Sequence, residues 1–584
     1  MAGERDEPPA RLTQLLRAHA NAGAEAATVG ALGDEELGYR EFWNCVTKRA
    51  GWLVERGVRA GDRVALEVAC TTAVMVASVA VLACGAVLVP LGVYGGAGSQ
   101  DRLRALAALR ASGARWYLSA GAPVAAPHEA HAAGLRPEYL SLADVPGDVL
   151  RPLPPEPAAD APALIQFSSG SLAAPRGIVL THGNLAANLS ALALRHGRAS
   201  DSRCVSWLPL SHDFGLIGCF WGCLYPGAAF RAMAPSAFVR DPLAWIEQLS
   251  AFRATHAGAP PFGYEMAAGR AERARDRLAG IDLSALSVAV VGAERIVPSL
   301  CERFEEVFAP YGLRRHVLLP AYGLAENCVA AASRSPLVPS VVGRFDVAAL
   351  ERGRLQPVSA GHAPGQVREL IGHGGPLSGT DVRIVAPDGR PVPDGWVGEI
   401  RIGGASTARH IVGPDGTAHP AAGTDGLVPT GDLGAVRDGE LYVIGRMKET
   451  LKHSGRLLAP ADVEQSVLDA APNDLGTVAA VAVARPDAVT EELVLFLELS
   501  AVRRAAVGPS EEAELARAAR LAVLREFRVP VSEIYVARRG ALPRTTSGKV
   551  QRLGLGAAVL AGKLPPGVTP AGTVPVPRPG GVPR

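Results

Sequence analysis

The sequence predicts an α/β protein: a large N-terminal domain of two α/β subdomains plus a β-rich subdomain, then a small mobile α+β domain. Three observations predict this fold. Helix-like and strand-like segments alternate over most of the chain, short strands with turn signals follow from about residue 375, and a compact mixed pattern follows Arg446. Alternating helices and apolar strands are typical of sheets that helices cover. A chain of 584 residues also exceeds one ordinary core, so at least two domains are expected.

Four segments illustrate the alternation in the N-terminal part. Residues 40–56 have helical spacing, and residues 62–68 (DRVALEV) have the apolar character of a buried strand. Residues 287–292 (SVAVVG) predict another strand. Residues 299–309 predict an amphipathic helix, with phenylalanines on one face and glutamates on the other.

Residues 73–93 form an apolar stretch that is long enough to cross a membrane. However, the stretch is rich in alanine, Gly85 interrupts it, and Pro90 follows a short β-branched run. A buried helix that turns at Cys84–Gly85 into a buried strand at 86–89 explains the pattern better. We therefore expect no membrane span.

The end of the chain changes character twice. Asp-Gly pairs at 388–389, 394–395 and 438–439 mark hairpin turns, which predicts a β-rich subdomain at about 375–446. A C-terminal domain is then expected at 447–562, after an N-terminal domain of residues 1–446. The proline- and glycine-rich tail, 563–584, has little to bury and is expected to be disordered.

Composition limits the classes of partner. The formal net charge is only +2, from 59 basic and 57 acidic residues, so no broad field attracts nucleic acid and a small-molecule substrate is favoured. The eight cysteines are scattered and are interpreted as reduced core residues. The first residues, MAGERDEPPARL, contain no apolar signal core, and a cytoplasmic enzyme is expected.

The strongest local feature is a loop of small hydroxylated residues between two apolar strands. The strand at 163–167 leads into Ser168, Ser169, Gly170 and Ser171. Glycine lets backbone N–H groups approach an anion closely, and serine hydroxyls donate further hydrogen bonds, as the phosphates of ATP require. No GKS or GKT follows, which excludes the lysine-bearing nucleotide loop. Taken alone, the loop could equally be a polar hairpin.

Six further motifs follow in order. They are WLPLSHDFGLIG (207–218), GAERI (292–296), AYGLAEN (321–327), PTGDLG (429–434), LYVIGRMKE (441–449) and LPRTTSGKVQR (542–552). With these motifs the chain resembles the adenylate-forming superfamily of acyl-CoA synthetases, peptide-synthetase adenylation domains and luciferases, from about residue 10 to residue 562. Any one motif is weak, whereas six in the right order are specific.

Within that superfamily, the chain is most similar to fatty acyl-AMP ligases. The segments that carry this likeness are 207–218, 239–265, 304–326 and 345–358. The last segment looks like part of the insertion that characterises the subgroup, placed here at about 341–375. The resemblance implies ATP and Mg²⁺ as cofactors and an acyl carrier protein as the acceptor of a fatty acyl group.

The resemblance assigns two charged residues to the chemistry. Lys549 matches the catalytic lysine, whose ammonium would screen the carboxylate and the α-phosphate as they approach each other. The alternative is an exposed lysine in a turn. Glu326 would hold Mg²⁺, directly or through water, and would otherwise cap a helix or form a salt bridge.

The nucleotide site follows from the same likeness. Tyr322 would pack against adenine, or would be a core aromatic. Asp432 would accept hydrogen bonds from the ribose hydroxyls, and Arg446 would reach the ribose or form a surface salt bridge. The complete expected ATP site consists of Ser168, Ser169, Gly170, Ser171, Gly292, Ala293, Glu294, Tyr322, Gly323, Asp432 and Arg446.

The acyl site and the hinge are implied in the same way. His212 would position the acyl carboxylate, because no Gly-x-Ser-x-Gly elbow accompanies it to make a hydrolase triad. Lys448 matches the hinge about which the C-terminal domain would rotate after adenylation. Aromatic candidates for the acyl pocket could also be core residues. The acyl-binding candidates are His212, Asp213, Phe214, Phe262, Tyr264 and Gly323.

Two substitutions depart from the family pattern in the phosphate loop. Leu172 stands where relatives usually have threonine, and Arg176 replaces a loop lysine but keeps its charge. The resemblance still implies a ligase that makes an acyl-adenylate and passes the acyl group to a carrier protein in lipid, polyketide or lipopeptide biosynthesis. The alternatives are an acyl-CoA or aryl-CoA ligase, and a non-catalytic relative that binds acyl chains or a carrier protein.

Overall fold

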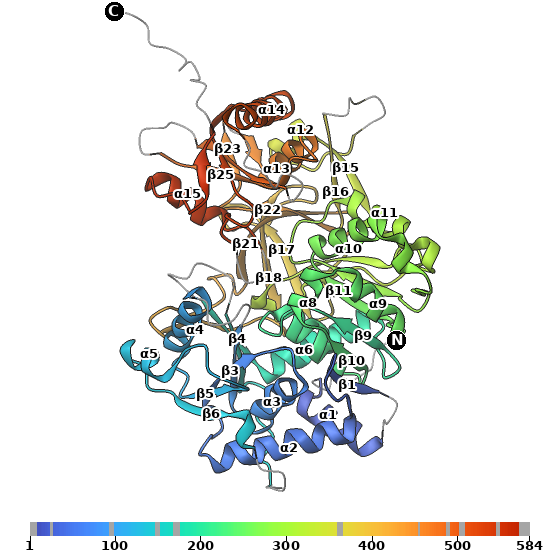
Figure 1. Ribbon diagram of the computed structural model, residues 1–584, viewed down its shortest axis with the longest axis vertical. Coiled ribbons are helices and arrows are strands. Elements are labelled where there is room, and N and C mark those ends of the chain that lie inside the picture. The colour runs from blue at the N-terminus through green and yellow to red at the C-terminus, as the bar shows by residue number, and fades with distance from the viewer. Residues whose placement is uncertain are drawn as a thin grey trace, which may run out of the picture.

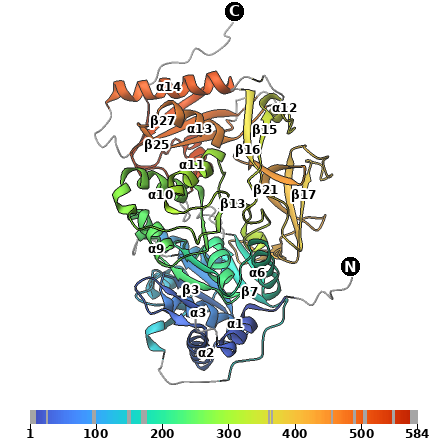
Figure 2. The ribbon, with the colours of Figure 1, turned by 90° about the vertical axis from the view of Figure 1, so that its right-hand side faces the viewer.

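The computed structural model describes residues 9–23, 27–92, 99–145, 152–167, 176–358, 362, 366–453, 456–485, 491–500, 508–544 and 549–571. Figure 1 shows the N-terminal part as a broad α/β body and the C-terminal part as a smaller module above it. Figure 2 shows the small antiparallel sheet of β17 and β21 along one side of the molecule. The predicted α/β fold class is confirmed.

Two eight-stranded sheets form the body. The first has the order β14-β13-β12-β11-β9-β10-β1-β2, and the second has the order β20-β19-β8-β7-β4-β3-β5-β6. The first contains β1 (Thr28–Ala31), β2 (Leu37–Gly38), β9 (Arg203–Ser206), β10 (Ala229–Ala232), β11 (His256–Ala259), β12 (Val288–Val291), β13 (Leu318–Tyr322) and β14 (Ala332–Ser333). The second contains β3 (Arg63–Val68), β4 (Val87–Gly92), β5 (Trp116–Ser119), β6 (Glu138–Ser141), β7 (Pro162–Phe167), β8 (Gly177–Thr181), β19 (His410–Val412) and β20 (Ala418–Pro420).

Helices cover both sheets. The longer ones are α1 (Leu12–Ala22), α2 (Tyr39–Glu55), α3 (Thr72–Ala83), α4 (Ser99–Ser112), α6 (His182–His196), α9 (Leu243–Ala251), α10 (Pro261–Arg273) and α11 (Pro298–Phe308). The shorter ones are α5 (Pro127–Ala132), α7 (Gly222–Leu224), α8 (Pro235–Arg240), η1 (Leu142–Asp144), η2 (Phe214–Trp221), η3 (Arg275–Leu278), η4 (Ala309–Tyr311) and η5 (Ala325–Asn327). The helices and strands predicted at 40–56, 62–68, 287–292 and 299–309 are confirmed.

The apolar stretch at 73–93 is α3 followed by β4. Thr71 caps the start of α3, and the chain leaves the helix at Cys84 and turns at Gly85, whose φ is +75°. A left-handed φ favours glycine, which is why the helix ends there. Among the described residues, no helix has the length and apolar character that crossing a membrane needs.

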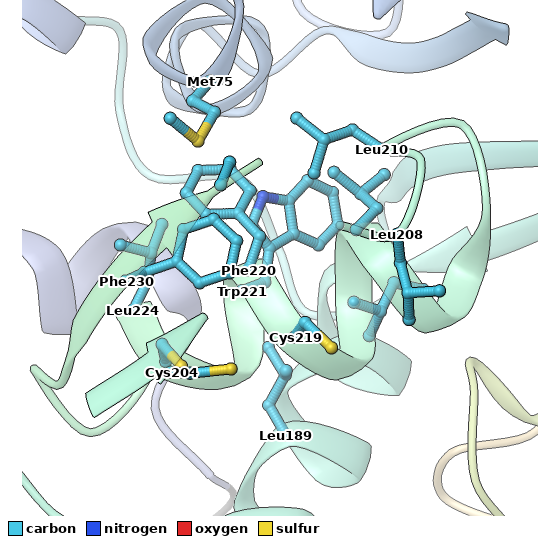
Figure 3. Close-up of a cluster of buried hydrophobic side chains, with 14 of the residues drawn as sticks. Met75, Leu189, Cys204, Leu208, Leu210, Cys219, Phe220, Trp221, Leu224 and Phe230 are labelled. Atoms are coloured by element: carbon cyan, nitrogen blue, oxygen red, sulfur yellow. The ribbon is translucent and has the colours of Figure 1, made fainter. Parts of the chain in front are cut away.

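The two α/β subdomains share one core. Figure 3 shows Met75 of α3 and Leu189 of α6 on opposite sides of η2, close to Phe220 and Trp221. These side chains are buried and belong to the largest hydrophobic cluster. Because α3 and α6 belong to the second sheet and η2 to the first, this packing fixes the two subdomains against each other.

The small sheet has the order β17-β18-β21-β22, from β17 (Thr380–Val385), β18 (Gly398–Gly404), β21 (Val428–Arg437) and β22 (Glu440–Arg446). Asp438 and Gly439 join β21 to β22, both with positive φ, as the predicted hairpin requires. One expectation is wrong. The segment 410–420 does not stay in this β-rich subdomain, because β19 pairs with β8 and extends the second large sheet.

The expected insertion is a hairpin of β15 (Val342–Asp346) and β16 (Val367–Ile371), with α12 (Val347–Glu351) between them.

The C-terminal module contains a four-stranded sheet of order β25-β26-β27-β28. The predicted boundary at residue 562 is too early, because β28 pairs with β27 and the Ala571 amide donates to the Ile534 carbonyl at 2.9 Å. Residues 563–571 therefore belong to the module, and 572–584 lie outside the described residues. The elements are β23 (Leu451–His453), β24 (Arg456–Leu458), α13 (Pro460–Ala470), β25 (Leu475–Val483), β26 (Glu492–Leu499), α14 (Pro509–Phe527), β27 (Val531–Ala537), α15 (Arg552–Leu560) and β28 (Val568–Pro570).

Candidate active site

The expected site residues follow four neighbouring strands of the first sheet. Strands β9, β11, β12 and β13 are adjacent and parallel, so their carboxyl ends meet at one edge. The segments that leave these ends carry His212 to Phe214, Phe262, Gly292 to Glu294, and Tyr322 to Glu326. Such an edge is where α/β sheets bind ligands. Motifs that are far apart in the sequence thus converge on one place.

At the end of the site expected to hold the ribose (the ribose end), buried Tyr322 and Asp432 form a trio with the exposed Arg446. The Tyr322 hydroxyl donates to Oδ2 of Asp432 at 2.7 Å, and Nε of Arg446 lies 2.7 Å from Oδ1 of the same carboxylate. Asp432 and Arg446 are directly opposite each other in the β21–β22 register. Burial raises the pKa of Asp432, while Arg446 and the Tyr322 hydroxyl lower it. The strand pairing itself therefore holds the acceptor and the cation in place.

Two glycines allow the backbone to close around this trio. A Cβ at Gly323 would lie 1.9 Å from the Val329 carbonyl oxygen, and a Cβ at Gly292 would lie 2.8 Å from the Ala321 carbonyl oxygen. Neither position can hold a side chain without moving the backbone. Gly323 therefore has a steric role here, since the chain from Tyr322 turns back on itself at this point.

Glu326 lies in the short helix η5, just beyond Tyr322. Burial raises its pKa, its own backbone N–H together with Arg176 and Arg446 lowers it, and the carboxylate of Asp213 raises it. Its carboxylate is therefore within electrostatic reach of both the ribose trio and the His212–Asp213 segment. The Glu326 carbonyl accepts a hydrogen bond from the Ala408 amide at 2.8 Å, which fixes the backbone.

Lys549 reaches the site from the C-terminal module. Its ammonium donates to the carbonyl oxygen of Ala293, the second residue after β12, where φ is +68°. The charge of Lys549 lowers the pKa of Asp432 and of Glu294, although burial raises both. The ammonium group therefore lies at the carboxyl end of β12, within electrostatic reach of Asp432.

The His212–Asp213 segment leads into the π-helix η2. Nδ1 of His212 lies 3.5 Å from Oδ1 of Asp213, and that oxygen accepts the Phe214 amide at 2.7 Å. The ring of Phe214 is only partly buried. It covers two glycines, since a Cβ would approach it to 2.9 Å at Gly258 and to 3.2 Å at Gly218. A π-helix beside a site is a common functional feature.

The other two aromatic candidates differ from each other. Phe262 at the start of α10 is partly exposed, with its ring edge-on to Trp207 at 5.7 Å. Tyr264 is fully buried, its hydroxyl donates to the Val290 carbonyl at 2.9 Å, and its ring packs on Trp245 and Phe304. The geometry favours a packing role for Tyr264, and leaves Phe214 and Phe262 as the candidates for an acyl pocket.

Comparison with known proteins decides the family. A model of the AMP-binding enzyme family matches residues 16–412. The chain belongs to the AMP-binding enzyme family. Its nucleotide is accordingly ATP.

Relatives and solved structures agree. The chain is 33% identical over 418 residues to the medium-chain-fatty-acid–[acyl-carrier-protein] ligase JamA of Moorena producens (strain JHB). The aligned region covers 70% of each chain. It is 34% identical over 413 residues to the 4-hydroxyphenylalkanoate adenylyltransferase of Mycobacterium tuberculosis (strain H37Rv), covering 67% of this chain and 64% of that protein. A structure from studies of fatty acyl-adenylate ligases from E. coli and L. pneumophila matches with a TM-score of 0.83 and 27% identity, covering 95% and 98% of the two chains.

Part of the expected ATP site lies outside the described residues. This applies to Ser168, Ser169, Gly170, Ser171 and Leu172 of the expected phosphate loop. The strand before the loop is tied to the site, because Nε2 of Gln166 donates to the Ser211 carbonyl at 2.7 Å. Arg176, on the far side of the loop, is exposed and acts electrostatically on Glu326.

The hinge candidate Lys448 is exposed and is the second residue after the strand that carries Arg446. The Met447 amide donates to the Gly431 carbonyl at 2.9 Å, so the ribose trio and the proposed hinge share one pair of strands.

One interface was missed by sequence reasoning. Arg295 of the body and Arg368 of β16 both pair with Asp462 of α13, the second with an N–O distance of 3.0 Å. The guanidinium of Arg368 also lies 5.7 Å from the centre of the Phe527 ring in α14. Burial lowers the pKa of Arg295 to about 9. No local pattern could have revealed these partners, because they are far apart in the sequence.

Proposed function

We propose that the protein is an acyl-AMP ligase. It activates a fatty acid with ATP to give an acyl-adenylate and pyrophosphate, and then transfers the acyl group to the phosphopantetheine thiol of an acyl carrier protein, with AMP as the leaving group. The observation that carries the proposal is that Lys549, from the C-terminal module, donates to the Ala293 carbonyl and acts electrostatically on Asp432 of the Tyr322–Asp432–Arg446 trio. Cation, ribose acceptor and aromatic ring then surround one nucleotide.

In the first step, an oxygen of the fatty carboxylate attacks the α-phosphorus of ATP. The bond from that phosphorus to the oxygen bridging to the β-phosphate breaks, and pyrophosphate leaves with the electron pair. No proton has to be transferred, so catalysis consists of alignment and charge screening. The Lys549 ammonium supplies the screening, Asp432 fixes the ribose, and the imidazole of His212 orients the carboxylate.

Mg²⁺ fits the residues that are present. Among the described residues, no group of three or more histidine, cysteine or acidic side chains could hold a metal alone. Mg²⁺ in ATP enzymes is instead held by one or two carboxylates together with phosphate oxygens and water. Glu326 suits this, because burial raises its pKa and a nearby cation would relieve the cost of its charge. When bound, the ion neutralises the leaving pyrophosphate.

The acyl chain is proposed to enter beside Phe214 and Phe262. Both rings are partly exposed, and both follow strands whose carboxyl ends face the nucleotide. A pocket with aromatic walls suits an apolar chain better than a polar acid. The relative named 4-hydroxyphenylalkanoate adenylyltransferase makes an aryl-containing acid the second candidate substrate.

The acceptor is proposed to be a carrier protein rather than free CoA. Two features support this. Arg368, which lies in the insertion, holds Asp462 of the C-terminal module, so the insertion contributes to the restraint of that module. The relative JamA is named as an acyl-carrier-protein ligase. We also place the enzyme in the cytoplasm, where ATP is abundant and its eight free cysteines would stay reduced.

The decisive experiment is a pyrophosphate-release panel. Fatty acids of increasing length and several aryl acids are each incubated with the enzyme, ATP and Mg²⁺. We expect release that requires both acid and ATP and peaks at a particular fatty chain length. No pyrophosphate release with any acid of the panel would contradict the proposal and would support a non-catalytic binding role.

A second experiment separates the acceptors. With the best acid, holo-carrier protein and CoA are supplied in separate reactions, and the thioester is followed by mass spectrometry. Thioester on the carrier with little acyl-CoA is expected. Acyl-CoA as the main product would make the protein an acyl-CoA ligase instead.

A further inference from the structure

The residues on the two sides of Lys549 are joined to each other. The Gln551 amide donates to the Pro543 carbonyl at 2.9 Å, and Arg544 and Val550 form an isolated antiparallel bridge. These contacts shape the backbone beside Lys549, but they do not fix where this segment stands in the C-terminal module. Placing the ammonium therefore requires a side chain that anchors the segment to the rest of the module.

Arg552 is in a position to provide this anchor. It is the first residue of α15 and lies three residues after Lys549. A cation at the start of a helix is unfavourable, because the helix dipole is positive at that end. Arg552 therefore gains nothing from its own helix and needs negative charge from another element.

Two glutamates of the module supply this charge. Nε and Nη2 of Arg552 donate to Oε1 and Oε2 of Glu464, each at 2.7 Å, and Nη1 donates to Oε2 of Glu449 at 3.2 Å. Burial lowers the pKa of Arg552, but Glu464, Glu449 and Glu294 raise it above its ordinary value. A bidentate arginine–carboxylate pair fixes direction as well as distance, so the guanidinium is held in one orientation.

Glu464 fixes Arg552 to the core of the module. It lies in α13 and is only 8% exposed. Its Oε1 also accepts the amide of Ala480 in β25 at 2.9 Å. A buried carboxylate is tolerated when a cation and further donors satisfy it, as they do here. A helix and a strand thus hold the carboxylate to which Arg552 is bound.

Glu449 links Arg552 to the hinge segment. It is the residue after the hinge candidate Lys448, and its amide donates to the Arg446 carbonyl at 3.1 Å. Arg446 is the cation of the ribose end. A continuous series of contacts therefore leads from the ribose end, through the hinge segment, to the segment that carries Lys549.

We propose that Arg552 is a positioning residue for adenylation. Its contacts with Glu464 and Glu449 set where Lys549 stands relative to the hinge. The inference rests on the proposed function. All of these residues follow the hinge candidate in the chain, so their contacts move with the module. The ion pairs of Asp462 differ, because they join the module to the rest of the molecule.

The two steps of the reaction make different demands on this arrangement. Adenylation needs the Lys549 ammonium in place, and misplacing a catalytic group by about 1 Å can cost ~10²-fold in rate. Transfer of the acyl group from a ready-made acyl-adenylate does not need it, because the module carries Lys549 away for that step. Loss of Arg552 should therefore slow the first step and spare the second, whereas general loosening of the module would slow both.

The test uses the full chain with Arg552→Gln, and Arg485→Gln is the matched control. Arg485 lies in the same module and also pairs with two glutamates, with Glu492 at 2.9 Å and with Glu533. Arg552→Lys keeps the charge but loses the bidentate geometry. Glu449→Gln is a milder variant, which removes one charge and keeps the size of the side chain.

Three quantities are measured for each variant. They are kcat of pyrophosphate release, Kd for ATP by isothermal titration calorimetry, and the rate of acyl transfer from supplied acyl-adenylate to holo-carrier protein or CoA. We expect Arg552→Gln to lower kcat about ten-fold or more, Arg552→Lys to restore part of it, and Glu449→Gln to lose less. Kd and acyl transfer should stay within about two-fold of wild type, and Arg485→Gln should match wild type throughout.

A double variant assigns the effect to the pair of Arg552 and Glu464. Arg552→Gln with Glu464→Gln should lower kcat little more than Arg552→Gln alone, because substitutions of two residues in contact are not additive. If the two losses multiply instead, the residues act independently and the inference is wrong.

The outcomes separate this inference from the proposed function. No pyrophosphate release by the wild type with any acid would refute the proposed function, and the inference with it. Release by the wild type with an unchanged kcat in Arg552→Gln would overturn the inference alone. Equal loss in Arg485→Gln, or equal loss of both steps in Arg552→Gln, would show a purely structural role and would also overturn it. If Arg552→Gln does not fold, an unchanged kcat in Glu449→Gln would overturn it.

Discussion

The ribose end and the lysine end of the site are built in different ways. At the ribose end, Tyr322, Asp432 and Arg446 are linked by two contacts of 2.7 Å, and the pairing of β21 with β22 holds two of them opposite each other. At the lysine end, Lys549 approaches from a separate module and donates to the backbone carbonyl of Ala293.

This difference indicates a division of labour. The ribose end is formed before the nucleotide arrives, so binding costs little rearrangement there. The lysine end depends on where the C-terminal module stands, and so can be removed for the second step. Substitutions should therefore separate into those that change ATP affinity and those that change the rate of chemistry.

The largest effect is expected for Lys549→Ala. Removing a cation that acts on developing charge should lower the rate of pyrophosphate release by ~10²–10³-fold. The affinity for ATP, measured by isothermal titration calorimetry, should change much less because the ribose trio is intact. Lys563→Ala provides a lysine control in the same module. A loss confined to ATP affinity would contradict the division between the two ends.

The next largest effect is expected for Asp432→Asn. The substitution weakens a charge-assisted contact to Arg446 and the acceptor for the ribose, and should weaken ATP binding about ten-fold or more. The maximal rate at saturating ATP should fall less than the affinity. Asp438→Asn, in the exposed turn of the same hairpin, is the control. Unchanged affinity would show that the nucleotide binds elsewhere.

The ribose end should also be sensitive to acid. His373 lies edge-on to Tyr322, with ring centres 6.5 Å apart, and burial lowers its pKa to about 4 from an ordinary 6.5. Below pH 6.5, His373 therefore binds a proton in the unfolded chain but stays unprotonated in the folded chain until the pH approaches 4. The contribution of the neutral His373 to the free energy of unfolding is fully present above pH 6.5 and is lost as the pH falls towards 4. At pH 5 the loss from this one group is about 2 kcal/mol.

Thermal unfolding at pH 7.5 and pH 5 measures this effect. His373→Gln should reduce the drop in Tm between the two values, whereas His419→Gln, at an exposed position, should not. Other buried histidines also contribute to the drop, so the comparison between the two variants is the informative quantity. An equal drop in both would exclude His373 as a source of acid sensitivity.

The smallest effect is expected for Asp462→Asn, which acts on the lysine end from a distance. Arg295 and Arg368 would lose their shared carboxylate, and the module would be held less firmly in the orientation that presents Lys549. Adenylation should slow by several-fold, at a cost of about 1 kcal/mol, and transfer to CoA should rise. Asp469→Asn, exposed on the same helix, is the control. Faster adenylation in Asp462→Asn would mean that the interface opposes this orientation.

Sequence patterns predicted the large elements well because their signals are local. Helix α3 and strand β4 were expected from Gly85 and from the apolar run on each side of it. Of the four parallel strands that lead to the site, only β12 was predicted, from the apolar run at 287–292. The pattern could not predict β19 or β28, since three residues are too few to show an alternation.

The site was predicted less completely than the fold. Motifs located Asp432, Tyr322 and Lys549, but a motif does not say which aromatic side chain is buried. Tyr264 lies in the core because its hydroxyl finds the Val290 carbonyl there, a partner that only the fold brings near. The Arg295–Asp462–Arg368 cluster could not be predicted either, because only the fold brings these three residues together.

Strand β19 follows β18 of the small sheet in the chain but pairs with β8 of the second large sheet. This arrangement limits how chimeras of this enzyme could be made. Consider a chimera in which only the residues before about 375 come from another ligase. Its β8 would come from one protein and its β19 from the other, so two strands that did not evolve together would have to pair within one sheet. A junction after Arg446 would cut no sheet of the body. Grafting experiments should therefore treat residues 9–446 as one indivisible cassette and exchange the C-terminal module as a whole.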